Sequence, residues 1–280
     1  MVYRMYYAPS DLKTALDVVS QFNVRVIAGG TDFFPSLKHG QIPTEILDVT
    51  GIADLHNITQ STDGTRIGSA VTWSQIIECN LPSEFEGLKQ AALEVGSIQI
   101  QNAGTLVGNV CNASPAADGV PPLLTLNAVV EVASRARGLR KIPLSEFLLG
   151  VRETALKTDE LVTAITIPPA TSNMGAAFEK LGSRKFLVIS ITMTAAMISC
   201  DKLGRISEAR IAVGACSPVA LRLPQLEASL IGQLFSDVYV NPDCFKMLAP
   251  IDDVRGSKEF RLEVLPKQCE RVISKAINYG

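Results

Sequence analysis

A strand-like run that ends in two glycines contains the first residues that could do chemistry. Residues 25–33 read Arg-Val-Ile-Ala-Gly-Gly-Thr-Asp-Phe, which predicts a buried strand that delivers Gly29 and Gly30 to the start of a helix. Glycines let the backbone approach a bulky anion, and exposed N–H groups at a helix N-terminus bind phosphate oxygens. Asp32 would repel a close phosphate, so we expect it to cap the helix or to meet a sugar hydroxyl. A tight turn that needs glycine only for its conformation explains the segment equally well.

Residues 102–118 form a second segment, in which small and hydrogen-bonding side chains dominate. It reads Asn-Ala-Gly-Thr-Leu-Val-Gly-Asn-Val-Cys-Asn-Ala-Ser-Pro-Ala-Ala-Asp and stands in an otherwise apolar chain. Each missing large side chain gives up roughly 1.5–3 kcal/mol of packing, and a buried polar ligand would explain that loss. A solvated loop is the alternative, because loops also favour these residue types. The apolar residues Leu106, Val107 and Val110 argue against a simple surface loop.

Several common site patterns are missing from the sequence. There is no GxGxxG fingerprint, and no Gly-Lys-Ser/Thr follows either glycine segment. The six cysteines contain no CxxC pair, and His39 and His56 form no HExxH pattern. We therefore expect no metal site in this chain and reduced, mostly buried cysteines. We assign no residue as an acid–base catalyst.

Composition narrows the class of protein. Of 280 residues, 47% are hydrophobic and 19% are charged, which is enough apolar material for a sizeable packed core. The net charge of −2 comes with lysines and arginines spread along the whole chain, so nucleic acid is not an expected partner. The first residues lack a signal-peptide layout. The longest apolar stretch, residues 186–200, is shorter than the about 20 residues that a bilayer span needs. We expect a cytoplasmic protein with no membrane segment.

Apolar periodicity and turn residues predict the order of the elements. The first part is expected to hold a helix over 12–22 capped by Ser10, a brief helix that starts at Thr31 or Asp32 and ends at Gly40, and a helix capped by Thr72. Further helices are expected over 82–95 and 123–126, and strands over 25–28, 45–49, 66–70, 129–133 and 161–167. A proline-rich polar linker at 168–173 precedes strands over 176–181, 187–199 and 206–215, a hairpin turn at 201–204 and a helix over 270–277.

Together the two glycine segments resemble the FAD-binding subunit of molybdenum hydroxylases, the family of xanthine dehydrogenase and aerobic carbon monoxide dehydrogenase. Residues 28–32 are similar to its Ala-Gly-Gly-Thr/His-Asp/Ser motif, and residues 105–118 to its Thr-x-Gly-Gly-Asn and Ala-Ser-Pro-x-x-Asp motifs. Val107 departs from the pattern, since many members have glycine there. Three more motifs match in order, at Asp159–Val162, Phe178–Arg184 and Asp253–Arg261.

The resemblance implies a set of FAD-binding residues. Those expected at the pyrophosphate and adjoining ribose are Arg25, Val26, Ile27, Ala28, Gly29, Gly30, Thr31, Asp32, Phe33, Thr105, Gly108 and Asn109. Ala113, Ser114 and Asp118 would meet the ribityl hydroxyls or the flavin edge, and Val162 would pack on adenine. Lys180 would lie near the ribose or phosphate, and Phe186 over the isoalloxazine. The alternatives are a solvated strand charge for Lys180 and a core aromatic for Phe186.

The resemblance also implies a fold and an activity. The fold would be an α/β, two-lobed FAD-binding domain of the vanillyl-alcohol oxidase-like (PCMH) type at 1–172, with lobes at about 1–55 and 56–172. A C-terminal α+β domain at 173–280 would contain a three-stranded antiparallel sheet. A molybdopterin-containing large subunit would send electrons through two [2Fe-2S] clusters of a small subunit to FAD, and then to NAD⁺ or another acceptor. A free-standing FAD-dependent oxidoreductase and a flavin-free assembly protein on the same fold are the alternatives.

Overall fold

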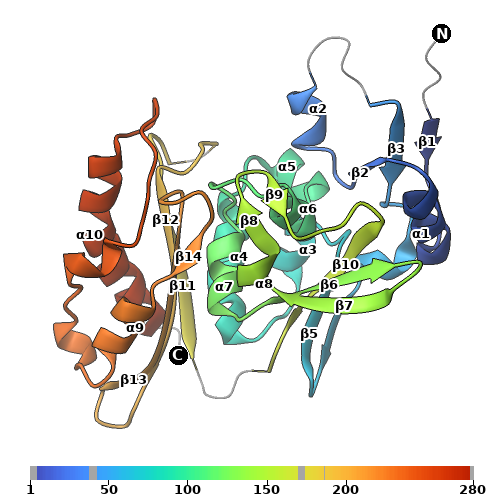
Figure 1. Ribbon diagram of the computed structural model, residues 1–280. Helices are drawn as coiled ribbons and strands as arrows, with labels where there is room; N and C mark the ends of the chain where they lie inside the picture. Colours follow the sequence, from blue (N-terminus) through green and yellow to red (C-terminus); the bar gives the residue numbers. More distant parts are fainter. Residues whose placement is uncertain (1–4, 38–42, 170–173, 186, 278–280) are drawn as a thin grey trace.

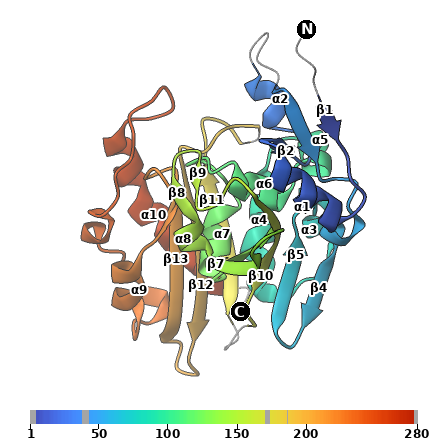
Figure 2. The same cartoon turned by 45° about the vertical axis from the view of Figure 1, so that its right-hand side comes forward.

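The computed structural model describes residues 5–37, 43–169, 174–185 and 187–277. The fold is mixed α/β and is built in layers (Figures 1 and 2). A small parallel sheet with the order β1-β3-β2 lies at the N-terminal end. Its strands are β1 (Met5–Tyr7), β3 (Glu45–Asp48) and β2 (Arg25–Ile27).

Helix α1 (Leu12–Gln21) connects the first two of these strands in sequence and buries Ala15 and Val19. Its cap is Asp11, whose carboxylate accepts a hydrogen bond from the Thr14 N–H at 2.9 Å. The prediction of Ser10 as the cap is therefore wrong by one residue. The neighbouring aspartate occupies the position from which a side chain reaches the third N–H of the helix.

A five-stranded antiparallel sheet with the order β4-β5-β10-β6-β7 forms the second layer. Its strands are β4 (Ile58–Ser61), β5 (Gly64–Gly68), β10 (Glu160–Ile167), β6 (Val129–Ser134) and β7 (Gly138–Pro143). A short hairpin of β8 (Leu148–Gly150) and β9 (Glu153–Thr154) follows β7. Strands β4 and β7 and this hairpin were not predicted, because they are short and carry little apolar alternation.

Short helices pack between this sheet and the C-terminal sheet. They are α3 (Trp73–Glu78), α4 (Glu86–Glu94), α5 (Ile98–Ala103), α6 (Leu106–Cys111), α7 (Val120–Thr125) and α8 (Leu144–Phe147). The helix predicted over 82–95 is a short 3₁₀ turn that continues into α4. One hydrophobic core joins these helices to both sheets, since it includes Leu106, Ile165 and Met197.

The C-terminal sheet is antiparallel and has the order β11-β12-β13-β14. Its strands are β11 (Gly175–Leu181), β12 (Thr192–Cys200), β13 (Ile206–Gly214) and β14 (Leu221–Arg222). Three long strands were predicted, and the two-residue β14 adds a fourth. The strand predicted from residue 187 begins at Thr192, so residues 187–191 lie outside the sheet.

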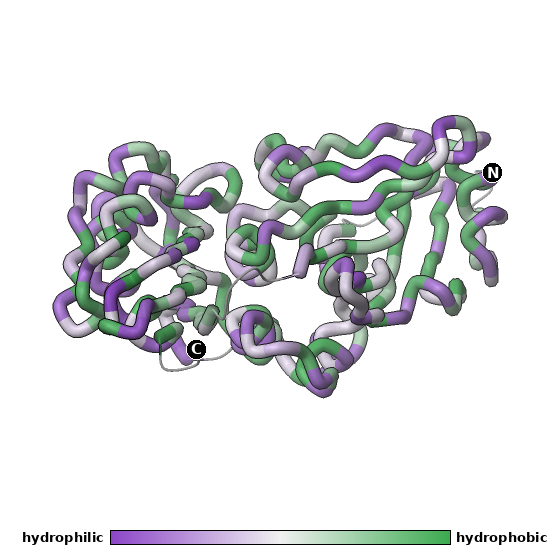
Figure 3. The backbone as a smooth tube through the Cα atoms, turned by 90° about the horizontal axis from the view of Figure 1, so that it is seen from below, coloured by the Kyte–Doolittle hydropathy of each residue, from purple (hydrophilic) through white to green (hydrophobic). Residues whose placement is uncertain are grey.

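Helices α9 (Pro224–Leu230) and α10 (Lys258–Ile277) cover the face of this sheet that is remote from the other domain (Figure 1). Helix α10 is longer than the predicted 270–277. The sequence concealed its first half, because Pro266 lies inside the helix and proline usually ends or kinks one. The predicted hairpin turn is confirmed: the N–H of Gly204, which has a φ of +74°, donates to the Asp201 carbonyl at 3.0 Å. Figure 3 shows apolar and polar residues interspersed along the chain in both parts of the molecule. Strand β12 is buried at its first seven positions, because helices pack on both faces of this sheet.

The remaining elements are short. They are α2 (Phe33–Ser36) and the 3₁₀ turns Ala53–His56, Ser83–Phe85, Phe235–Asp237 and Pro242–Phe245. All six cysteines lie in the described ranges and are free thiols; Cys216, Cys244 and Cys269 are buried, and the other three are half-buried. No helix in the described part of the chain is both long and apolar enough to cross a bilayer.

Candidate functional site

A cavity of about 1050 Å³ lies where the small parallel sheet, helices α5 and α6 and strand β10 meet the start of the C-terminal domain. Both glycine segments line it. The predicted residues in its wall are Arg25, Val26, Ile27, Ala28, Gly29, Gly30, Thr31, Asp32, Phe33, Thr105, Gly108, Asn109, Asp118, Val162 and Lys180. Ala113 and Ser114 do not line it, and Phe186 lies outside the described residues. The fold thus brings together segments that are far apart in the sequence.

The two glycines after β2 have a structural reason for being glycine. A Cβ at Gly29 would stand 1.7 Å from the carbonyl oxygen of Ala103, at the end of α5. Gly30 has a φ of +67°, which side-chain-bearing residues rarely adopt. The conformational explanation of this segment therefore accounts for Gly30, while Gly29 is needed for the close approach of the Ala103 backbone. The close approach also presses the first glycine segment against the second, so both present their backbone to the same cavity.

The second glycine segment is packed against the core through helix α6, so it is not a simple solvated loop. Thr105 caps α6, and its Oγ1 accepts a hydrogen bond from the Gly108 N–H at 2.9 Å. A Cβ at Gly108 would lie 2.7 Å from that oxygen, so glycine keeps the cap in place. Asn109 Oδ1 accepts from the Gly119 N–H at 3.2 Å and fixes the chain beyond the helix. The N-terminal turn of α6 therefore forms part of the cavity wall, while its Leu106 and Gly108 N–H groups are bonded to the Val71 carbonyl and to Thr105 Oγ1.

Asp118 and Lys180 form a buried ion pair in the cavity wall. Lys180 Nζ lies 2.7 Å from Asp118 Oδ2, and their side chains are only 5% and 10% exposed. Ser190 Oγ donates to Asp118 Oδ1 at 2.6 Å, and Lys180 also donates to the Glu94 carbonyl at 3.3 Å. Burial raises the pKa of Asp118, and the charge of Lys180 opposes that rise. The alternative of a solvated Lys180 is wrong, because β11 directs it into the interior.

Asp32 does not cap a helix, contrary to one of our expectations. It stands at the start of α2 but makes no capping hydrogen bond. Its Oδ2 instead accepts from Arg152 Nη1 at 2.9 Å, in a half-exposed ion pair. Arg152 lines the cavity and was not predicted. It follows Gly150 in a hairpin turn, and no sequence signal distinguishes it from other arginines at the surface.

Arg152 is held in an uncommon backbone conformation. Its φ is +61°, and its N–H donates at 2.9 Å to the carbonyl of Ala113, whose φ is +47°. Side-chain-bearing residues with such angles cost free energy and persist where the surroundings impose them. Ala113 therefore has a role although it does not line the cavity, because it fixes the backbone that carries Arg152.

Ser69 is a second cavity residue that the sequence did not reveal. It follows β5, is 5% exposed and lines the cavity. Its Oγ has no hydrogen-bond partner among the residues that the structure describes. Buried hydroxyls are nearly always hydrogen-bonded, so an unpaired one in a cavity wall fits a ligand that supplies the partner. A lone serine between apolar residues gave no such signal in the sequence.

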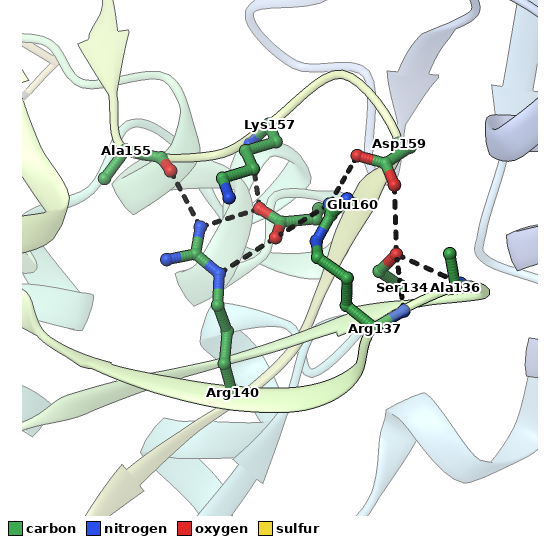
Figure 4. Close-up of polar contacts among 8 residues, drawn as sticks. All are labelled: Ser134, Ala136, Arg137, Arg140, Ala155, Lys157, Asp159 and Glu160. Atoms are coloured by element: carbon green, nitrogen blue, oxygen red, sulfur yellow. Dashed lines mark hydrogen bonds and ion pairs between the residues drawn. The ribbon is translucent and has the colours of Figure 1, made fainter.

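The two acidic residues of the motif at 159–162, Asp159 and Glu160, position a strand and do not line the cavity. Glu160 accepts hydrogen bonds of 2.9 and 2.7 Å from Arg140 and of 3.2 Å from Arg137, both on the β6–β7 hairpin (Figure 4). Burial works to raise the pKa of Glu160, but these arginines and the N–H of Lys157 outweigh it, so the pKa lies below its usual range. The Glu160 carboxylate is therefore held ionised outside the cavity wall.

The same strand delivers two apolar residues to the cavity. Leu161 and Val162 follow the anchored Glu160 and line the wall. The pairing of β10 with β6 shifts register between Val162 and Ala164, so a bulge occurs where the strand passes the cavity. The position of Val162 agrees with a packing role against a flat ligand.

Comparison with known proteins matches both halves of the chain. Residues 2–170 match the family described as the FAD binding domain in molybdopterin dehydrogenase, and residues 176–276 match the CO dehydrogenase flavoprotein C-terminal domain. A xanthine dehydrogenase FAD-binding subunit from Escherichia coli O157:H7 is 31% identical over 283 residues, covering 98% of this chain and 96% of that protein. A nicotinate dehydrogenase FAD-subunit from Eubacterium barkeri is 32% identical over 237 residues, with coverages of 81% and 79%.

Solved structures show the same architecture. Quinoline 2-oxidoreductase from Pseudomonas putida 86 superposes with a TM-score of 0.87 at 26% identity, covering 98% of this chain and 97% of that one. Carbon monoxide dehydrogenase from Hydrogenophaga pseudoflava superposes with a TM-score of 0.90 at 24% identity, covering 99% and 98%. The second likeness bears on the fold alone. These matches confirm the expected fold class.

Proposed function

Because this chain belongs to the family of FAD-binding subunits of molybdenum hydroxylases, we propose that it carries electrons between protein partners through FAD. The electrons would come from [2Fe-2S] clusters of a small subunit, which a molybdopterin-containing large subunit supplies, and would leave to NAD⁺ or another acceptor. Two relatives are named as parts of larger enzymes: a nicotine 6-hydroxylase medium subunit and a carbon monoxide dehydrogenase medium chain.

The observation that carries the proposal is the single cavity lined by both glycine segments. Its volume of about 1050 Å³ is at the upper end of ordinary small-molecule pockets, as a large cofactor requires. The unpaired hydroxyl of Ser69 in its wall needs a partner that the described protein atoms do not supply. The residues present therefore fit a long, polar cofactor such as FAD.

We assign the ends of the cofactor from the chemistry of the wall. The N–H groups near Gly29 and Gly30, in the backbone that lines the cavity, suit the anionic pyrophosphate. Arg152 offsets the charge of Asp32 beside that region and keeps it compatible with an anion. Leu161 and Val162 suit the apolar faces of adenine. Because Lys180 is paired with Asp118, we assign both to the flavin end, in place of the ribose or phosphate expected for Lys180.

Within this proposal the protein binds the cofactor, orients it and shields it from water. FAD, when bound, supplies the one- and two-electron chemistry that amino acids lack. The Ser190–Asp118–Lys180 cluster fixes local charge in a water-poor wall, where such a charge acts more strongly than in solvent. Both carboxylates that line the cavity, Asp32 and Asp118, are ion-paired. That arrangement favours a relay over a free-standing oxidoreductase, which would need an available general base.

We also propose that the two domains bind different parts of the cofactor. Residues 1–172, in lobes of about 1–55 and 56–172, would bind most of the cofactor. Residues 173–280 would close the flavin side through β11, which carries Lys180, and the segment 187–189 that lines the cavity.

The test begins with the flavin and continues to the partners. The purified chain, reconstituted with FAD, should show a flavin absorption band at about 450 nm. A chain that takes up no FAD would disprove the proposal and leave the assembly-protein alternative. The complex isolated with its native partners should contain molybdenum and about four irons per FAD, as two [2Fe-2S] clusters require. FAD-loaded protein that oxidises a substrate without molybdenum or iron would favour the free-standing enzyme.

A further inference from the structure

The motif at Asp253–Arg261 takes no part in the cavity wall but ends in a buried arginine. The Arg261 side chain, on the first turn of α10, is only 2% exposed. Its Nη2 lies 2.7 Å from Asp253 Oδ1, and its Nη1 donates to two backbone carbonyls, that of Ala215 at 3.1 Å and that of Ile191. A buried guanidinium is costly to desolvate, and the Nε of this one has no hydrogen-bond partner among the described residues. The three contacts of its two Nη atoms therefore call for an explanation.

Both carbonyls belong to segments that lead to the flavin cavity. Ile191 follows residues 187–189, which line the cavity. Ser190, between them, donates to the carboxylate of Asp118 at 2.6 Å. On the other side, the Ala215 N–H donates at 2.8 Å to the carbonyl of Pro115, three residues before Asp118. One guanidinium therefore holds the two backbones that flank the Asp118 cluster.

The turn that precedes Arg261 in the motif holds the carboxylate that this arginine binds. Asp253 and Gly256 close a turn through backbone hydrogen bonds of 3.3 and 3.2 Å, and Arg255 binds Asp253 Oδ2 at 2.8 Å. Burial works to raise the pKa of Asp253, but hydrogen bonds from Arg255 and the two arginine charges outweigh it, so the pKa is lowered. A Cβ at Gly256 would lie 3.3 Å from Ile191 Cγ2, so the turn itself packs against the held segment.

We propose that Arg261 is a positioning residue for the flavin site: by holding the Ile191 and Ala215 carbonyls, it fixes residues 187–191 and the Asp118 cluster against the cofactor. This inference rests on the proposed function, because it assigns the cavity to FAD. Lysine cannot replace arginine here, since a single ammonium lacks the planar fork that reaches two carbonyls and a carboxylate together.

The experiment compares four variants of the full chain. Arg261→Met removes the guanidinium, Arg261→Lys keeps only a charge, and Asp253→Asn leaves the guanidinium but removes its ionic partner. Arg271→Gln is the matched control: it removes an arginine of the same helix that pairs with Glu179 at the surface. Four quantities are measured: hydrogen exchange of residues 187–191 without FAD, the dissociation constant for FAD, the fine structure of the flavin absorption band, and thermal unfolding.

Arg261→Met and Arg261→Lys should speed hydrogen exchange at residues 187–191 and weaken FAD binding by about tenfold or more. The flavin absorption band should lose its fine structure in both variants. Asp253→Asn should do the same to a smaller degree. Arg271→Gln should change thermal unfolding alone. If both Arg261 variants unfold at a lower temperature but keep wild-type exchange, affinity and spectrum, the inference is overturned.

Two further outcomes are also decisive. If the Arg261 variants do not fold, Asp253→Asn decides, and an unchanged exchange pattern at 187–191 in that variant rejects the positioning role. If the wild-type chain binds no FAD, the proposed function fails. Exchange at 187–191 then still shows whether Arg261 holds this segment.

Discussion

Two buried carboxylates of this protein, Glu160 and Asp118, sit in similar settings and behave in opposite ways. Each is paired with a cation that a strand carries, Arg140 of β7 for Glu160 and Lys180 of β11 for Asp118. Glu160 receives three hydrogen bonds from Arg137 and Arg140 and a fourth of 2.8 Å from the Lys157 N–H. Asp118 receives one from Lys180 and one from Ser190. The pKa of Glu160 is lowered and that of Asp118 is raised, burial being the factor that works upward in both.

The number of hydrogen-bond donors therefore distinguishes a carboxylate that stabilises the fold from one that is available to a ligand. Four donors offset the cost of burying the Glu160 charge, and this residue lies outside the cavity wall. Two donors do not offset that cost for Asp118, which lines the cavity. An incompletely satisfied carboxylate in a cavity wall can accept further donors from a ligand. The saturated cluster holds the fold, and we propose that the unsaturated one serves the flavin.

The largest expected effect comes from Glu160→Gln. The fold favours the ionised form of Glu160, so a neutral isostere should lower the free energy of unfolding by about 3 kcal/mol, at the low end for a buried pair because the arginines are partly exposed. Urea denaturation at neutral pH measures this. The neighbouring Asp159→Asn, which affects a more exposed carboxylate, should cost clearly less. Equal losses in the two variants would mean that donor number does not set the stability.

Asp118→Asn should produce the converse pattern. Because the fold raises the pKa of Asp118, the neutral isostere removes a charge that is costly to bury, and this gain offsets part of the cost of leaving the buried Lys180 without its counter-ion. The variant should therefore lose less stability than Glu160→Gln. FAD affinity should nevertheless fall by about tenfold, since Lys180 loses the charge that holds it in the cavity wall. Parallel denaturation and flavin titration of the two variants measure both quantities. A stability loss as large as that of Glu160→Gln, with unchanged FAD affinity, would remove the distinction between the clusters.

Acid titration sharpens the same comparison. The lowered pKa of Glu160 means that its contribution to stability is present above the unfolded value of about 4.3 and is lost as the pH falls through the lower folded value. The raised pKa of Asp118 has the opposite sign: its contribution is complete below about 3.9 and is lost as the pH rises through the folded value. The stability difference between wild type and Glu160→Gln should therefore shrink in acid. As the pH falls, the stability of wild type relative to Asp118→Asn should instead rise. Stability differences that change with pH in the same direction for both variants would contradict the opposite pKa shifts of Glu160 and Asp118.

Many strands and turns of the fold could be predicted from the sequence, because the periodicity of apolar residues and the turn residues are local signals. The three long strands of the C-terminal sheet follow from alternation and from Gly204 in the hairpin turn. The second glycine segment was harder. Helix α6 is only six residues long, and its small side chains hide the helical period. Only its packing into the core shows that it is a helix.

The cavity was predicted in part for a similar reason. Gly29 and Asp118 belong to contiguous motifs, so sequence alone could propose them. Arg152 and Ser69 come from unrelated turns and join the site only through tertiary structure. The partners of Asp32 and Asp118 were equally hidden, since each ion pair joins residues more than sixty positions apart.

Ser69 extends the comparison to a hydroxyl with no hydrogen-bond partner among the described residues, and the smallest effect is expected there. Without FAD, Ser69→Ala should leave stability unchanged or slightly raised, because it removes a buried hydroxyl that has no hydrogen bond in the described structure. With FAD, the variant should bind about two- to tenfold more weakly, as the loss of one hydrogen bond predicts. Thr194→Val removes another buried hydroxyl, away from the cavity, and should leave FAD affinity unchanged. Thermal unfolding with and without FAD separates the two terms, and equal FAD affinity in wild type and Ser69→Ala would show that the hydroxyl does not meet the cofactor.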